Sequence, residues 1–272
     1  MKTNDWTMNG SCGELIYGTR HDPELASQDS PRGVVLMAHG FKGYKDYGMF
    51  PWLATQFAHV GYIVQRFNFA HSGMLGGDGL FERPDLFEQA TWNNQVEDLK
   101  ILAESFQQTD IPLILFGHSR GGAATLLATG RGDVEASGVI SLSAPSQCNS
   151  LTPDEQQRLL DEGRIESPSG RTGQMLYVGK NFLEEQLNSP EMHDLQQLIA
   201  GSTLPCLLIH GEVDQTVGID AAKQLEAALK DSTLAIIAGG DHVYNTPNPF
   251  SIDDEPSPQL RNVWNAILSW LP

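Results

Sequence analysis

Short, wholly apolar runs alternate along the chain with longer segments in which apolar residues recur at helical spacing. An apolar run of four to eight residues is typical of a strand buried on both faces, and an i, i+3, i+4 pattern is typical of a helix. Strands are predicted over 13–19 (with 6–8 as its pairing partner), 33–38, 62–69, 113–116, 138–142, 204–210 and 233–238. Helices are predicted over 50–60, 87–105, 120–129, 220–230 and 259–271. The alternation predicts an α/β fold with a mostly parallel central sheet flanked by helices.

One segment, residues 146–203, departs from the alternation. Residues 152–155 form a capping box with proline at the first helical position, which predicts a helix ending at Gly163. Residues 167–179 are rich in turn formers and favour a hairpin, and 189–201 predicts a further helix. An insertion after the carboxyl end of a strand is well placed to lie over an active site as a small lid. The alternative is a structural excursion remote from the site.

Length and composition change this picture little. A chain of 272 residues with 40% hydrophobic and 19% charged residues is ordinary for a globular protein, so we expect one domain over residues 1–272. The formal net charge of −17 argues against nucleic acid or an anionic membrane as partner, and a solubility surface is the simplest explanation for it.

We expect a cytoplasmic protein, since the N-terminus does not resemble a signal peptide and no run has the roughly 18 apolar residues of a membrane span. The three cysteines lack metal-ligand spacing, and neither a metal nor a cofactor is expected. The oligomeric state is not indicated.

The strand at 113–116 runs directly into Gly-His-Ser-Arg-Gly and then into small residues that favour a helix. A strand, a sharp turn and a helix with serine at the apex are the context in which this pentapeptide forms a nucleophile elbow. Gly117 and Gly121 stand where a side chain would crowd such a turn. We therefore predict Ser119 as a nucleophile; a phosphate-binding or inert turn is the alternative.

A serine hydroxyl needs a base, and on a parallel sheet the base comes from a later strand end, after the acid. Three histidines follow Ser119 in the chain. His193 lies in the predicted insertion, and His210 ends an apolar strand, where a packed or hydrogen-bonded core role is expected. His242 follows the last strand in a glycine-rich loop. We predict His242 as the base.

The acid that orients the base is expected after the strand that ends at residue 210. Asp214 lies four residues past that strand end, and we predict it as the acid. Glu212 is the second candidate, whereas Asp220 is expected to cap the following helix. Asp241 adjoins the histidine, cannot easily orient its neighbour's ring, and is expected to be solvated.

Two backbone N–H groups are candidates for the oxyanion hole of an acyl-transfer site. One belongs to Arg120, the residue after the nucleophile. The other is expected in the loop after strand 33–38, where Gly40 permits a bend and Phe41 supplies the donor. The Arg120 side chain is expected to bridge to an acid such as Asp214 or Glu97, or to be solvated.

Four motifs occur in the order that the α/β-hydrolase superfamily has. They are His-Gly-Phe at 39–41, Gly-His-Ser-Arg-Gly-Gly at 117–122, Gly-Glu-Val-Asp-x-x-Val at 211–217 and Gly-Gly-Asp-His at 239–242. The chain resembles this superfamily from about residue 33 to the C-terminus, and most of all its small bacterial serine esterases, the cinnamoyl and feruloyl esterases and the relatives of dienelactone hydrolases.

The resemblance implies a triad of Ser119, His242 and Asp214 with an oxyanion hole from Phe41 and Arg120. It also implies that the segment 146–203 shapes the substrate pocket, as the corresponding insertion does in cinnamoyl esterases. Arg120 stands where those esterases commonly have glutamine.

The predicted function is therefore that of a serine carboxylesterase that acts on small-molecule esters, feruloyl or cinnamoyl esters being one possible class, without a cofactor. A peptidase or thioesterase with the same residues is the first alternative. A non-catalytic binding protein of the same fold is the second, and loss of one of the predicted catalytic residues would have favoured it.

Overall fold

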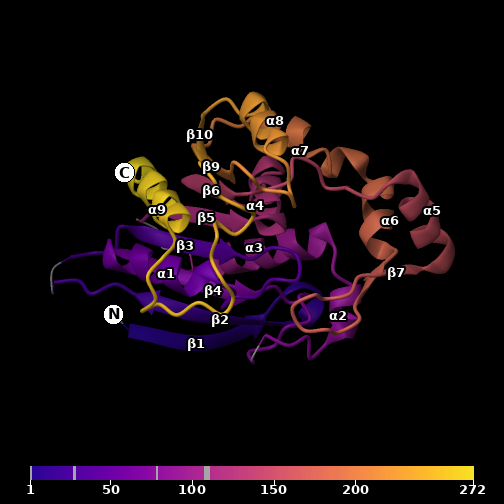
Figure 1. The fold of residues 1–272 in the computed structure, drawn as a ribbon, viewed down its shortest axis with the longest axis horizontal. Helices are drawn as coiled ribbons and strands as arrows, with labels where there is room; N and C mark the ends of the chain where they lie inside the picture. Colours follow the sequence, from indigo (N-terminus) through magenta and orange to yellow (C-terminus); the bar gives the residue numbers. More distant parts are fainter. Residues whose placement is uncertain (1, 27–28, 78, 107–110) are drawn as a thin grey trace.

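The computed structural model describes residues 2–26, 29–77, 79–106 and 111–272, and Figure 1 shows their arrangement. Within these residues, one eight-stranded sheet has the order β1-β2-β4-β3-β5-β6-β9-β10. Its strands are β1 (Lys2–Asn9), β2 (Leu15–Asp22), β3 (Gly33–Ala38), β4 (Tyr62–Asn68), β5 (Leu113–His118), β6 (Gly138–Leu142), β9 (Cys206–Gly211) and β10 (Ser232–Ile237). All neighbouring pairs from β4 to β10 are parallel, while β2 is antiparallel to both β1 and β4. The mostly parallel sheet predicted from the sequence is confirmed.

Helices cover both faces of the sheet, because the central strands are apolar on both sides. In β3, Val34 and Leu36 pack on the face covered by α3 and α4, and Val35 and Met37 pack on the face covered by α1 and α9. Figure 1 labels these helices around the sheet. The helices that flank the sheet are α1 (Met49–His59), α3 (Trp92–Phe106), α4 (Arg120–Gly130), α8 (Asp220–Ala228) and α9 (Pro258–Trp270). Two further short elements are η1 (Ser11–Gly13) and α2 (Pro84–Glu88).

The segment 146–203 forms a group of short elements between β6 and β9, several of which lie at one end of the molecule (Figure 1). They are α5 (Pro153–Glu162), β7 (Arg164–Glu166), β8 (Tyr177–Gly179), α6 (Asn181–Asn188), η2 (Pro190–Met192) and α7 (Leu195–Ile199). The predicted capping box opens α5, and Gly163 ends it in a left-handed conformation. β7 and β8 pair as an antiparallel hairpin, as predicted from the turn-rich stretch 167–179, but its first strand lies just before that stretch.

Two of the predicted helices are each divided into two shorter elements in the structure, so these two predictions are wrong. The single helix predicted over 87–105 is split into α2 and α3, because Thr91 and Asn94 exchange hydrogen bonds that start a new helix. The helix predicted over 189–201 is likewise split into η2 and α7, since Asp194 accepts a hydrogen bond from the backbone N–H of Gln197 and caps α7. Helix α6 was not predicted.

Candidate active site

Ser119 occupies the tight turn between β5 and α4, at φ 55° and ψ −124°. Its backbone N–H donates to the carbonyl oxygen of Leu142 at the end of β6, at 2.7 Å. A Cβ atom on Gly117 would lie 2.3 Å from the carbonyl oxygen of Gly121, and a Cβ on Gly121 would lie 2.3 Å from that of Ala38. Both glycines are therefore required by close backbone packing, for the reason that the sequence predicts.

Asp214 and His242 are joined by a hydrogen bond between Oδ2 and Nδ1, at 2.8 Å. The other carboxyl oxygen of Asp214 accepts from the backbone N–H groups of Thr216 and Val217, at 2.8 and 3.0 Å. Burial of the carboxyl opposes its ionisation, but the bonds from His242 and these N–H groups outweigh burial and hold the pKa of Asp214 below its usual value. An ionised Asp214 favours the tautomer of His242 with its proton on Nδ1, and Nε2 can then accept a proton.

The two other histidines that follow Ser119 have different surroundings. His210 is buried, and its Nε2 donates to the carbonyl oxygen of Val217 at 2.8 Å. This confirms the core role expected for it. His193 is also buried, with Nδ1 2.8 Å from the carbonyl oxygen of Ser189 inside the segment 146–203.

The remaining acid candidates also have partners of their own. Glu212 accepts from the backbone N–H of Gly239 at 2.9 Å. Asp220 is exposed and pairs with Lys223. Asp241 accepts from two backbone N–H groups of its own loop. Asp214 is thus the candidate that the structure brings into contact with His242.

His118, the residue before the serine, is a site residue that sequence reasoning missed. Its Nε2 donates to the carbonyl oxygen of His242 at 2.8 Å, and the two imidazole rings lie 4.8 Å apart. Burial, and secondarily the neighbouring His242, lowers the pKa of His118 to about 3. The imidazole is therefore neutral near pH 7, with its proton on Nε2. His118 occupies the first open position of the Gly-x-Ser-x-Gly motif, which specifies no residue there, so the motif gave no signal for it.

Ser119 lines two cavities. The smaller one, of about 160 Å³, is also lined by His118, His242 and residues 40–43. The larger one, of about 580 Å³, is lined by Phe41 and by residues of α3, α4 and the segment 146–203. Its walls are mainly apolar, which suits an acyl or alcohol group of moderate size.

The loop after β3 packs directly against the serine. A Cβ on Gly40 would lie 3.0 Å from Cβ of Ser119 and 3.2 Å from the carbonyl oxygen of His118. Phe41 follows in this loop and lines both cavities with Ser119. Arg120 is the first residue of α4, so its backbone N–H has no acceptor within the helix. The two predicted oxyanion donors thus belong to segments that meet at Ser119.

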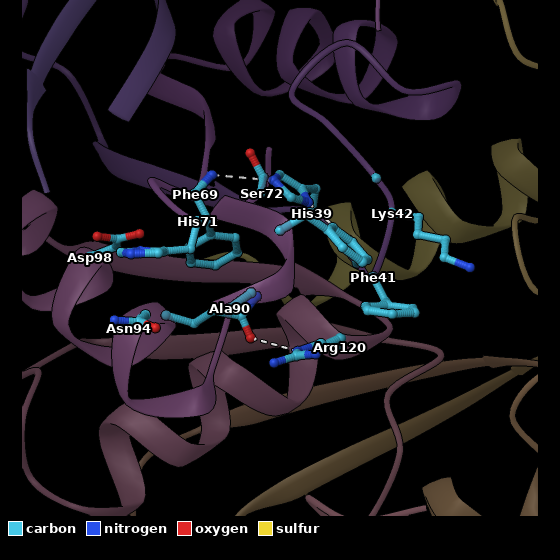
Figure 2. A pocket seen from close by; sticks show the side chains of 14 residues that line it. His39, Phe41, Lys42, Phe69, His71, Ser72, Ala90, Asn94, Asp98 and Arg120 are labelled. Atoms are coloured by element: carbon cyan, nitrogen blue, oxygen red, sulfur yellow. Dashed lines mark hydrogen bonds between the residues drawn. The ribbon is translucent and has the colours of Figure 1, made fainter. Parts of the chain in front are cut away.

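The Arg120 side chain has partners that the sequence did not predict. Its Nε donates to Oε1 of Gln95 at 2.8 Å, the hydrogen bond drawn as a dashed line ending at Arg120 in Figure 2. The guanidinium lies over three aromatic rings, 4.6 Å from that of Trp92, 4.8 Å from Phe182 and 5.6 Å from Phe41. Burial lowers the pKa of Arg120 to about 10, while its Nη2 has no hydrogen-bond partner among the described residues.

The predicted bridge from Arg120 to Asp214 or Glu97 is wrong, as is the alternative of a solvated guanidinium. Gln95 and Glu97 are two positions apart and so face different sides of α3, and Glu97 is exposed. The oxygens of Asp214 already accept from its own loop and from His242. The aromatic residues from α3 and from the unpredicted α6 gave no signal in the sequence.

The part of the chain that the structure describes contains no group of three or more His, Cys, Asp or Glu side chains that could hold a metal ion. In the same residues, none of the helices combines the length and apolar character that crossing a bilayer requires.

Comparison with known proteins agrees with this architecture. A family model described as serine aminopeptidase, S33, matches residues 29–162. A monoacylglycerol lipase of Mycolicibacterium smegmatis is 24% identical over 254 residues, which cover 83% of this chain and 86% of the lipase.

Two solved structures have the same fold. Est1E from Butyrivibrio proteoclasticus, with ferulic acid bound, has a TM-score of 0.72 and 16% identity, covering 96% of this chain and 98% of that one. The esterase domain of a Rhodothermus marinus protein has a TM-score of 0.61 and 22% identity, covering 90% of this chain and 91% of that one. With its sheet order and its serine elbow, the chain has the α/β-hydrolase fold, and the matched family model covers just under half of it.

Proposed function

We propose that this α/β-hydrolase is a serine carboxylesterase for small carboxylic esters, with Ser119 as nucleophile, His242 as base and Asp214 as the acid that orients the base. One observation carries the proposal. Ser119 and His242 line a common cavity, and His242 is held by the buried, ionised Asp214. These groups have the roles that nucleophilic acyl transfer requires.

In the proposed reaction, Oγ of Ser119 attacks the acyl carbon while Nε2 of His242 takes the hydroxyl proton. The carbonyl oxygen becomes an oxyanion that accepts hydrogen bonds from the backbone N–H groups of Phe41 and Arg120. Protonated His242 then gives its proton to the leaving alcohol. His242 then takes a proton from a water molecule, whose oxygen attacks the acyl carbon; the bond to Oγ breaks, His242 returns the proton to Oγ, and the carboxylic acid leaves.

We also propose that the segment 146–203 acts as a small lid that shapes the substrate pocket. Its residues make up much of the wall of the larger cavity, including the apolar side chains of Ile165, Val178 and Phe182. An aromatic or aliphatic acyl group suits such a wall. The likeness to Est1E with bound ferulic acid and to a monoacylglycerol lipase makes feruloyl and acylglycerol esters the first substrates to compare.

The test is hydrolysis of 4-nitrophenyl acetate, butyrate and octanoate, with methyl ferulate alongside, by the wild type and by Ser119→Ala. We expect the wild type to cleave short esters and Ser119→Ala to lose roughly 10⁴-fold or more in kcat/KM, as removal of a nucleophile does in other serine hydrolases. Ser269→Ala on the exposed side of α9 is the matched control and should retain full activity.

Other outcomes separate the alternatives. A wild type that is inert on every ester but cleaves aminoacyl 4-nitroanilides or acyl thioesters would make the protein a peptidase or thioesterase. Full activity in Ser119→Ala would exclude Ser119 as nucleophile. A wild type inert on all of these substrates would favour a binding role.

A further inference from the structure

Three cations line the cavities around Ser119, and none of them forms an ion pair with a described carboxylate. The chain has 34 acidic residues and 17 lysines and arginines, so partners for cations are abundant. In the described part of the chain, Lys42, Arg120 and Arg171 nevertheless form no ion pair and are held by carbonyl oxygens, an amide and aromatic rings. For Lys42 and Arg171 no described carboxylate lies within ion-pair distance, whereas Glu185 acts on Arg120 from a longer distance and partly offsets the effect of burial on its pKa.

Lys42 and Arg171 line the smaller cavity together with Ser119 and His242. Lys42 follows Phe41 in the loop after β3, and Arg171 comes from the loop between β7 and β8. The two cations thus reach the cavity from the body of the fold and from the segment 146–203. The cavity of about 160 Å³ is below the usual size of a complete ligand site, so it suits one short group of a substrate.

Each of these two cations donates one hydrogen bond to a described residue. Nζ of Lys42 donates to the carbonyl oxygen of Pro168 at 2.8 Å and lies 5.2 Å from the ring of Phe41. Arg171 lies over the ring of Tyr44 at 4.8 Å, and its Nη1 donates to the carbonyl oxygen of Gly79. An ammonium has three donors and a guanidinium has five.

The environment of Lys42 also disfavours its charge. Burial lowers the pKa of Lys42, and among the described residues no carboxylate offsets that effect. An anion that enters the cavity would restore the missing counter-charge, and hydrogen bonds between ionised groups are stronger than neutral ones.

We propose that the smaller cavity is an anion subsite that binds a carboxylate of the substrate, one short link away from the ester that Ser119 attacks. The substrate class is a carboxylic ester with an apolar group on one side, for the larger cavity, and a short anionic group on the other. This proposal rests on the proposed esterase function. The experiments below distinguish a failure of the anion subsite from a failure of the esterase proposal.

The first experiment compares charged esters with neutral esters of the same shape, in a pH-stat at pH 7.5. In the first pair, monoethyl succinate and ethyl 4-methylpentanoate, the carboxylate or the isopropyl group that replaces it is on the acyl side of the ester. In the second pair, carboxymethyl butyrate and isobutyl butyrate, it is on the alcohol side. We expect the charged member of one pair to have the higher kcat/KM, by about tenfold to a hundredfold, and that pair identifies the side that enters the cavity.

The variants are Lys42→Met and Arg171→Gln, with Arg171→Lys as the conservative replacement. We expect the charged-to-neutral ratio to fall about tenfold or more in the first two and to be largely kept in Arg171→Lys. Added salt should lower the same ratio in the wild type. The matched control is Arg164→Gln, since Arg164 belongs to the same hairpin but lies against Tyr177, outside the cavity. Its ratio should not change.

The second experiment does not need turnover. Monoethyl succinate and carboxymethyl butyrate are titrated calorimetrically into Ser119→Ala and into Ser119→Ala combined with Arg171→Gln. Binding that weakens about tenfold in the combined variant supports the subsite even if no ester is hydrolysed, in which case only the esterase proposal fails. Ester hydrolysis with charged-to-neutral ratios near one in both pairs, or binding that does not depend on Arg171, overturns the subsite and leaves the esterase proposal standing.

Discussion

Replacement of His118 by phenylalanine tests whether the residue before the serine holds the base in position. His118 is neutral near pH 7, and its Nε2–H donates to the carbonyl oxygen of His242 at 2.8 Å. The phenyl ring keeps the size of the side chain and its contact with Phe50, whose ring centre lies 6.4 Å from that of His118. The change therefore removes one hydrogen bond and little else.

The expected loss in kcat depends on the acceptor of the lost hydrogen bond, which is the carbonyl oxygen of His242. A buried carbonyl group left without a donor costs about 1–3 kcal/mol. This carbonyl belongs to His242 itself, so the loop can regain a donor only by moving, and the imidazole moves with it. If this whole cost of about 1–3 kcal/mol is added to the activation free energy through this displacement of the imidazole, kcat drops about 5-fold to 150-fold, because each 1.36 kcal/mol corresponds to a factor of ten. KM should change little, since the larger cavity keeps its walls.

The assay is steady-state hydrolysis of 4-nitrophenyl butyrate combined with thermal unfolding. His118→Gln, whose amide can donate to the same carbonyl, should recover most of kcat. Thr125→Val is the matched control, because it also removes a buried hydrogen bond, from Thr125 to the carbonyl oxygen of Gly122, but on α4 and away from the His242 loop. It should lower Tm by a few degrees without lowering kcat. A His118→Phe variant that also loses only Tm, with kcat within twofold of the wild type, would refute the positioning role.

Two further substitutions examine the base and the elbow. Asp214→Asn should keep the fold, as judged by circular dichroism, and should lower kcat on 4-nitrophenyl butyrate by about 10⁴-fold, because a neutral amide no longer selects the productive tautomer of His242; a loss below tenfold would mean that another acid orients the base. Gly117→Ala places a Cβ 2.3 Å from the carbonyl oxygen of Gly121 and should lower the free energy of unfolding in urea by about 1–3 kcal/mol or more. Gly218→Ala, which meets no atom within 4 Å, is its control, and equal stability of the two variants would contradict the packing argument.

The sheet could be predicted from the sequence because its central strands are apolar on both faces. The run 33–38 coincides with β3, and 138–142 coincides with β6. Helix limits were less predictable where side chains compete with the helix for backbone hydrogen bonds. Thr91 and Asn94 start a new helix inside an amphipathic stretch, and hydrophobic spacing does not register such local bonds.

The site was predictable to the extent that it depends on chain order. Ser119 lies on the turn that its motif predicts, and Asp214 and His242 lie at later strand ends, where order alone suggested them. The surroundings of Arg120 depend instead on which side of α3 faces the sheet and on a helix in the segment 146–203. The spacing of residues predicts neither of these features. An acidic partner was therefore expected for Arg120, whereas its guanidinium contacts the amide of Gln95 and aromatic rings.

The negative charge of the chain and the cations around its serine have to be explained separately. A solubility surface accounts for an excess of acidic residues, but it does not explain why Lys42 and Arg171 have no carboxylate partner among the residues that the structure describes. At physiological ionic strength, exposed charges more than about 8 Å apart are largely screened, whereas Lys42 and Arg171 line the cavity and act on a bound substrate at short range. The acidic surface therefore weakly opposes the approach of an anionic substrate, and the cations dominate once the substrate is in contact with the site. This division allows a strongly acidic protein to prefer an anionic ester, which is the preference that the charged and neutral ester pairs measure.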